Sequence, residues 1–158
     1  MPPLSPTEHS FVEQNGLFFE SSGLPRMAGR ILGWLFISDP QLQSLTEIAQ
    51  ALGASKASIS TNTRLLASTG LIERTSKPGS RGAYFQITAD GWTSLLEAKL
   101  RAVTHFKDLA AQGLVQLDYP PERLERLREV HDFYAFFENE FPDLMARWHA
   151  SRAAEETP

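Results

Sequence analysis

The sequence LTEIAQALGASKASIS, which spans residues 45–60, decides the fold. Its apolar residues have the spacing of two short helices that cross, and three of them fix the crossing angle: Ile48, Leu52 and Ile59. Ala49 is small where the helices meet, and Gly53 lets the chain reverse in a tight turn between them. This spacing predicts a helix-turn-helix. Such corners also occur in purely structural settings, so the spacing alone leaves the function open.

Capping signals mark the ends of both helices. Ser44 and Glu47 form a capping box at the start of the first helix, because each side chain can reach the backbone N–H of the other residue. Ser55 is placed to cap the second helix, and Gly70 is placed to end it, with Leu71 packing back.

The second helix contains no acidic residue. Between Ala54 and Leu71 there is no Asp or Glu, whereas a merely solvated helix usually mixes both charges. Such a surface suits a DNA major groove, because hydroxyls reach phosphates and Asn or Arg reach base edges. We expect Asn62 and Arg64 to read bases. The candidates for phosphate contacts are Ser55, Lys56, Ser58, Ser60 and Thr61.

Two predicted strands follow, at 71–75 and 83–88, joined by a glycine- and proline-rich loop at 76–82. Basic side chains at the tip of such a hairpin can reach the adjacent minor groove or its phosphates. The candidates in this loop are Lys77, Ser80 and Arg81. Together these features predict a winged helix-turn-helix. The expected fold is mainly α, with a small two- or three-stranded β wing and a helical dimerisation region.

Apolar helices are expected on the N-terminal side of this motif. Residues 1–7 hold three prolines and are expected to be a mobile arm, and a short apolar helix follows them. The next helix, at 25–37, is apolar almost all round, so we expect it to be buried. Gly29 and Gly33 lie four residues apart in it and present a smooth face to another helix.

Helical periodicity returns after the second strand. From residue 89 onward, apolar residues recur at spacings of three and four. Pro142 is expected to break or kink the last helix, and residues 151–158 are expected to form a frayed tail.

The charge is divided unevenly among three segments, which we expect to be the domains. Residues 24–88, the expected winged-helix DNA-binding domain, hold seven basic and three acidic residues, a net charge of +4. Residues 1–23, an arm and helix for dimerisation, carry −3, and the helical dimerisation region at 89–158 carries −5. The total of −4 over 158 residues therefore hides a basic middle, as expected if only the middle faces phosphates.

Several function classes are excluded by composition and motifs. The chain has no cysteine, which excludes disulfides, thiolate metal sites and thiol-based sensing. Its four histidines are scattered, and no catalytic or phosphate-binding motif is present. We therefore predict no enzyme, no cofactor and no metal site. No apolar run is long enough to span a membrane and no signal peptide is evident, so we expect a soluble cytoplasmic protein, at the nucleoid when bound to DNA.

Three stretches resemble the MarR-type winged-helix regulators, in particular their GbsR branch: PRMAGRILGWL at 25–35, LGASKASIS at 52–60 and GLIER at 70–74. The resemblance covers roughly residues 10–90. It implies a homodimeric transcriptional regulator, expected to be a repressor that releases DNA when a small ligand binds. It also implies that Arg26 and Arg30 lie on the helix beside the dimer interface.

The resemblance implies an effector site between the DNA-binding lobe and the dimer helices. Trp34, Trp92 and Phe106 are the candidate lining residues of this pocket. An aromatic cavity suits a quaternary ammonium or a planar phenolic compound, and the sequence does not choose between them.

Two functional hypotheses follow. The first is a homodimer on double-stranded DNA, because the first and last helices carry more apolar surface than a 158-residue monomer could cover. Two recognition helices in successive major grooves require a pseudo-palindromic operator with half-sites about 10 bp apart. The alternative is a winged-helix protein-interaction module that does not bind DNA. It requires an exposed apolar patch on the recognition helix, whose residues are instead polar.

Overall fold

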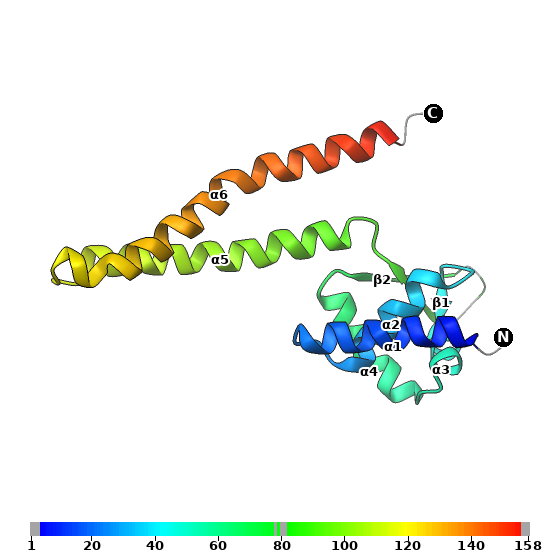
Figure 1. Ribbon diagram of the computed structural model, residues 1–158. Helices are drawn as coiled ribbons and strands as arrows, with labels where there is room; N and C mark the ends of the chain where they lie inside the picture. Colours follow the sequence, from blue (N-terminus) through cyan, green and yellow to red (C-terminus); the bar gives the residue numbers. More distant parts are fainter. Residues whose placement is uncertain (1–3, 78, 80–81, 156–158) are drawn as a thin grey trace. The chain divides into compact units, whose positions relative to one another are not determined.

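The computed structural model describes residues 4–77, 79 and 82–155, without the side chains of 98 and 101–103. It divides into two compact units, Met1–Leu95 and Leu96–Pro158. The elements are labelled in Figure 1: α1 (Pro6–Ser21), α2 (Arg26–Ile37), β1 (Gln43–Ser44), α3 (Leu45–Leu52), α4 (Lys56–Ser68), β2 (Ile72–Ser76), β3 (Ala83–Ile87), α5 (Gly91–Gln116) and α6 (Pro121–Glu155). The fold is the predicted one, mainly helical with a small antiparallel sheet.

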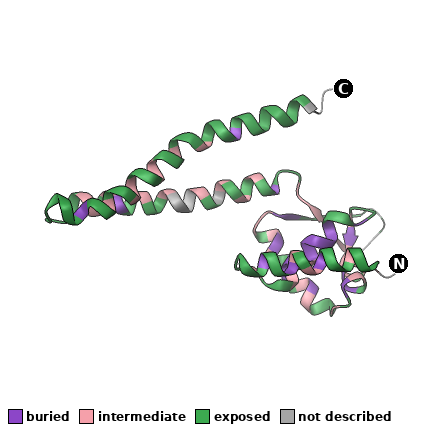
Figure 2. Ribbon diagram, viewed as in Figure 1, coloured by how far each residue is buried: buried purple, intermediate pink, exposed green. Residues whose placement is uncertain are grey.

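Helices α1 and α2 pack closely because glycines lie where they meet. A Cβ atom on Gly29 would lie 2.6 Å from the carbonyl oxygen of Asn15, and one on Gly33 would lie 2.9 Å from the Cβ of Asn15. The smooth face predicted for α2 is therefore real, and α1 is the helix that uses it. Most of α2 is buried, as predicted. Buried residues are concentrated in this first unit (Figure 2).

Helix α1 begins earlier than predicted. Ser5 and Glu8 form a capping box, in which the Glu8 carboxylate accepts from Ser5 N–H at 2.8 Å. Pro6 suits the first turn because its missing N–H has no partner there in any helix. Residues 6 and 7, which were expected to belong to the mobile arm, are therefore helical, and residues 1–3 lie outside the described residues.

The helix-turn-helix has the predicted caps. The Ser44 hydroxyl accepts from Glu47 N–H at 3.2 Å, and Ser44 N–H donates to the Glu47 carboxylate at 2.7 Å. Gly53 is left-handed, with φ of 59°, and ends α3. Leu71 is buried and its N–H donates to Leu66 O, so it packs back on the end of α4 as expected.

The wing is a three-stranded antiparallel sheet in the order β1-β3-β2. The β2–β3 hairpin pairs Ile72 with Ile87 at its base and Ser76 with Ala83 near its tip. The third strand is only two residues long, and it pairs Gln43 with Phe85. The prediction allowed two or three strands, but a strand this short has no alternation of side chains to detect, so the sequence located only the two strands of the hairpin.

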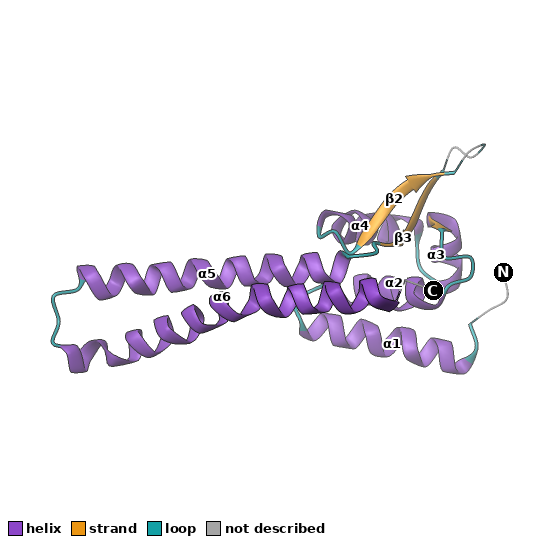
Figure 3. Ribbon diagram, turned by 90° about the horizontal axis from the view of Figure 1, so that it is seen from above, coloured by secondary structure: helices purple, strands orange, loops and turns teal. Residues whose placement is uncertain are grey.

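In the second unit, α5 and α6 run antiparallel (Figure 3). Lys107 on α5 forms an ion pair with Glu138 on α6. Pro142 lies inside α6, which continues through it to Glu155, so the proline does not end the helix. The prediction of a frayed tail was wrong for residues 151–155, since α6 continues to Glu155, and residues 156–158 lie outside the described residues.

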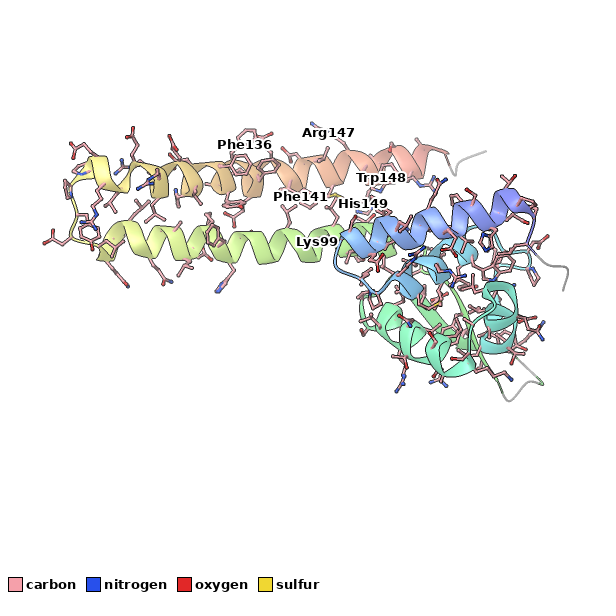
Figure 4. All side chains as sticks on the ribbon, turned by 60° about the horizontal axis from the view of Figure 1, so that its bottom comes forward. Lys99, Phe136, Phe141, Arg147, Trp148 and His149 are labelled. Atoms are coloured by element: carbon pink, nitrogen blue, oxygen red, sulfur yellow. The ribbon has the colours of Figure 1, made fainter. Side chains whose placement is uncertain are left out.

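The surface of this hairpin is rich in exposed apolar side chains. Phe136, Phe141 and Trp148 lie along α6 (Figure 4). Phe136 is 60% exposed and Trp148 is 50% exposed, while Phe141 lines a cavity of about 290 Å³ between α5 and α6. The hairpin therefore leaves uncovered much of the apolar surface that the sequence assigned to a dimer seam.

Candidate nucleic-acid interface

The start of α4 is suited to binding an anion. Its cap, the Ser55 hydroxyl, accepts from Ser58 N–H at 3.2 Å, and no acidic residue occupies the first turn. The free N–H groups and the helix dipole give this end a partial positive charge. Lys56, which is exposed, adds a full charge at the same end.

One face of α4 is exposed along its length. Ala57, Thr61, Arg64 and Ser68 are exposed, and their spacings of four, three and four residues put them in one row. Ser58 and Ser60 are half-buried beside this row. We call these six residues, together with Ser55 and Lys56, the α4 face. Sequence reasoning missed Ala57 and Ser68, although spacing counted from the buried residues of α4 would have found them.

Arg64 is held along its own helix. Its Nε donates to Ser60 O at 3.2 Å. In the described part of the chain no carboxylate pairs with it, so its charge is available to an outside partner.

Asn62 does not lie on the α4 face. Its side chain is buried, and its amide donates to Ser58 O at 2.9 Å. It lies three residues after Ile59 and four before Leu66, so helical periodicity turns it toward the core. The expectation that Asn62 reads a base does not fit this position, whereas Arg64 is exposed as that role requires.

The wing brings further basic residues to this unit. Lys77 is exposed after β2. The pKa of Glu47 is lowered mainly by its hydrogen bonds with Ser44, and the positive charge of Lys77 lowers it further. Arg74 is exposed on β2 and was missed by sequence reasoning, which considered only the loop. The other two predicted wing residues, Ser80 and Arg81, lie outside the described residues.

Family comparisons agree with this geometry. A model of the MarR family matches residues 22–81, and a model described as MmpR5-like MarR family transcriptional regulator matches residues 90–151. A curated relative, the HTH-type transcriptional regulator MmpR5 of Mycobacterium tuberculosis, is 45% identical over 139 residues, covering 87% of this chain and 84% of the relative. The chain belongs to the MarR family of transcriptional regulators.

A solved structure extends the likeness to the fold. The crystal structure of a transcriptional regulator is 44% identical to this MarR-family regulator, with a TM-score of 0.75. The match covers 92% of this chain and 99% of the chain in that crystal structure. The likeness therefore includes both the winged helix and most of the helical hairpin.

In this MarR-family regulator, Arg30 links three helices. Its Nε pairs with the Glu13 carboxylate of α1 at 2.7 Å, and its terminal nitrogen donates to Leu52 O at the end of α3 at 3.1 Å. Arg26 binds the other oxygen of Glu13 at 3.0 Å. Both arginines of α2 therefore have internal partners, and Arg30 ties α1 to the helix-turn-helix.

The three predicted effector-pocket residues have different surroundings. Trp34 is buried, and its indole N–H has no hydrogen-bond partner among the described residues. Trp92 stacks on Phe19, with ring centroids 5.8 Å apart, and on Phe36 at 5.7 Å. Phe106 belongs to the second unit, so a pocket shared by the three remains a prediction.

Over the described ranges, no three His, Asp or Glu side chains are grouped so that they could hold a metal ion. No helix in the same ranges is both long and apolar enough to cross a membrane.

Proposed function

We propose that this MarR-family regulator binds a pseudo-palindromic operator as a homodimer and represses transcription from it. Each α4 would enter a major groove, with half-sites about 10 bp apart. Lys77, Ser80 and Arg81 would serve the wing. Arg64 is the proposed base reader, and Ser55, Lys56, Ser58, Ser60 and Thr61 are proposed to bind phosphates or position the helix.

The observation that carries this proposal is the α4 face. It is exposed, contains no acidic residue and combines a positive helix end with two basic side chains. Phosphate contacts dominate DNA affinity, and a carboxylate on this face would oppose them. The alternative, a protein-interaction module, requires a large apolar patch here, yet the exposed residues of α4 are Lys56, Ala57, Thr61, Arg64 and Ser68.

Mobility-shift assays with the region upstream of its own gene test the proposal. We expect Arg64→Ala to cost about 1–3 kcal/mol and to relax specificity, because a base contact would be lost. Lys56→Ala should weaken binding to all sequences and reduce its salt dependence by about one ion. Arg147→Ala, which removes an exposed charge from α6, is the matched control.

One outcome would contradict the assignment of α4 as the DNA-contacting helix. If both Arg64→Ala and Lys56→Ala bind the native operator as the parent does, at two salt concentrations, α4 is not the recognition helix. Complete absence of salt-sensitive DNA binding would favour the interaction module.

Exposed apolar side chains support the homodimer. In α1, Phe18 is 63% exposed, and the helical hairpin exposes further large side chains: Leu96, Phe106, Leu109, Val115, Leu117, Tyr119, Phe133, Phe136, Phe137, Leu144 and Trp148. So many exposed apolar residues are typical of an interface. A second copy of the chain would cover them.

Three finer assignments complete the proposal. The GbsR branch is supported by the sequence resemblance, whereas the matched family model describes MmpR5-like regulators. A small-molecule effector in the pocket of Trp34, Trp92 and Phe106 would control DNA release. Action on chromosomal DNA implies the cytoplasm as the place of work.

A further inference from the structure

A cavity of about 480 Å³ lies between the last turn of α2 and the strands of the wing. It lies within the first unit and differs from the effector pocket considered above. Its lining residues include Phe36, Ile37, Ser38, Glu73, Gln86 and Ile87. The volume is in the range of small-molecule sites.

Ser38 gives this cavity an unused hydrogen-bonding group. The residue is 6% exposed, and its hydroxyl has no partner among the described residues. A buried hydroxyl without a partner costs free energy, which a ligand with a polar atom would recover. The cavity is therefore lined by a residue with an unpartnered hydroxyl, and its other polar lining residues are Gln41, Glu73 and Gln86.

The electrostatics favour a cation. None of the described lining residues is basic, and Glu73 contributes a carboxylate. Gln86 donates to one oxygen of that carboxylate, which fixes its position on the sheet. The C-terminal end of α2 adds partial negative charge, and its last turn holds no basic residue that would neutralise it.

Aromatic stacking fixes the apolar part of the cavity lining. Phe36 stacks on Trp92, which also stacks on Phe19, so the ring that faces the cavity is fixed in place. Ile37 and Ile87 complete a surface suited to an aromatic or aliphatic body.

We propose that this cavity binds small amphipathic amines. The ammonium pairs with Glu73, the apolar body packs on Phe36, Ile37 and Ile87, and a hydroxyl on the ligand satisfies Ser38. The ligand would join the end of α2 to the wing strands. Its effect on regulation rests on the proposed function, but binding itself does not.

Tyramine is the probe, and its relatives separate the contributions. Tyrosol replaces the ammonium by a neutral hydroxyl, 4-hydroxyphenylacetate replaces it by a carboxylate, and phenethylamine lacks only the phenol hydroxyl. Binding is measured on the full chain without DNA, by calorimetry and by amide chemical shifts in ¹⁵N-labelled protein. We expect tyramine to bind best, the anion not to bind, and shifts centred on residues 36–38, 73 and 86.

Two variants assign the contacts. Glu73→Gln should weaken both amines by about two- to fivefold, because an exposed ion pair is lost. Ser38→Ala should weaken tyramine to the level of phenethylamine and leave phenethylamine unchanged. It should not lower the melting temperature of the free protein, since only an unpartnered hydroxyl is removed. Glu20→Gln, which removes an exposed carboxylate of α1, is the control.

Other outcomes overturn the proposal. These are no tyramine binding at millimolar concentration, equal binding of the anion, or unchanged tyramine affinity in both variants. Failure here with intact operator binding would leave the proposed function standing, and loss of operator binding with intact tyramine binding would do the reverse.

Discussion

At the scale of single residues, Gly29 sets how closely α1 and α2 approach. A new methyl group would meet Asn15 O at 2.6 Å, Gly16 Cα at 2.9 Å and Phe19 Cβ at 2.9 Å. Two of these are backbone atoms and the third is bonded directly to the backbone, so none can be moved by rotating a side chain. We predict that Gly29→Ala destabilises the protein by about 1–3 kcal/mol, because the helices must separate. Thermal or urea unfolding measures this.

Gly113→Ala is the matched control for this experiment. A Cβ there would meet mainly the end of the Leu127 side chain, which can move. Because alanine also favours the helix, we expect little loss or a small gain. Equal destabilisation by both variants would mean that the contact of α1 with α2 is not tight.

Asn62 shows the limit of choosing residues by type. An amide side chain is chemically able to bind adenine, and position 62 lies in a correctly predicted helix that contains no acidic residue. The spacing that places Ile59 and Leu66 in the core also places 62 there, so the sequence contained the information. Arg64 and Thr61 pass the same test of spacing, since both are exposed.

At the scale of elements, the capping box of α3 stabilises a helix of only eight residues. We predict that Ser44→Ala costs about 1 kcal/mol, since the side-chain acceptor for Glu47 N–H is lost. Thr46→Ala, at an exposed position of the same helix, should change stability much less. Equal losses would show that the cap contributes little.

The same capping box should respond to acid. Hydrogen bonds with Ser44 lower the pKa of Glu47 below its usual 4.5. A carboxyl with a lowered folded-state pKa stabilises the protein above its unfolded pKa, and this contribution is lost as pH falls through the folded value. We predict that Ser44→Ala shrinks the stability loss between pH 5 and pH 3. An unchanged acid-side slope, measured by thermal unfolding against pH, would contradict this.

Elements with strong local signals were predictable from sequence. The caps at Ser44 and Ser55 and the left-handed Gly53 act within a few residues, so their positions follow from local chemistry. The position of β1 could not be predicted in this way, because its two residues form a strand only through their pairing with β3. The cavity at the end of α2 could not be predicted either, since it joins residues 35–38 to residues 73, 86, 87 and 89, which lie far apart in the chain.

At the scale of the whole molecule, the exposed apolar surface of the helices implies association. We predict that light scattering at micromolar concentration gives twice the 17.6 kDa chain mass. Inserting about 5 bp between the operator half-sites should abolish tight binding, because the second half-site then faces away. Inserting a full turn restores the facing and is the control. A monomer, or indifference to spacing, would contradict the proposal.

The guanidinium of Arg30 has a consequence for how the molecule unfolds. It holds Glu13 of α1 and the last carbonyl of α3 at once, so neither helix can leave without breaking a partly buried charged contact. Local fraying of the helix-turn-helix is thereby coupled to detachment of the N-terminal helix, and the two open as one cooperative unit. Through this one side chain, a change that loosens α1 should also loosen the helix-turn-helix.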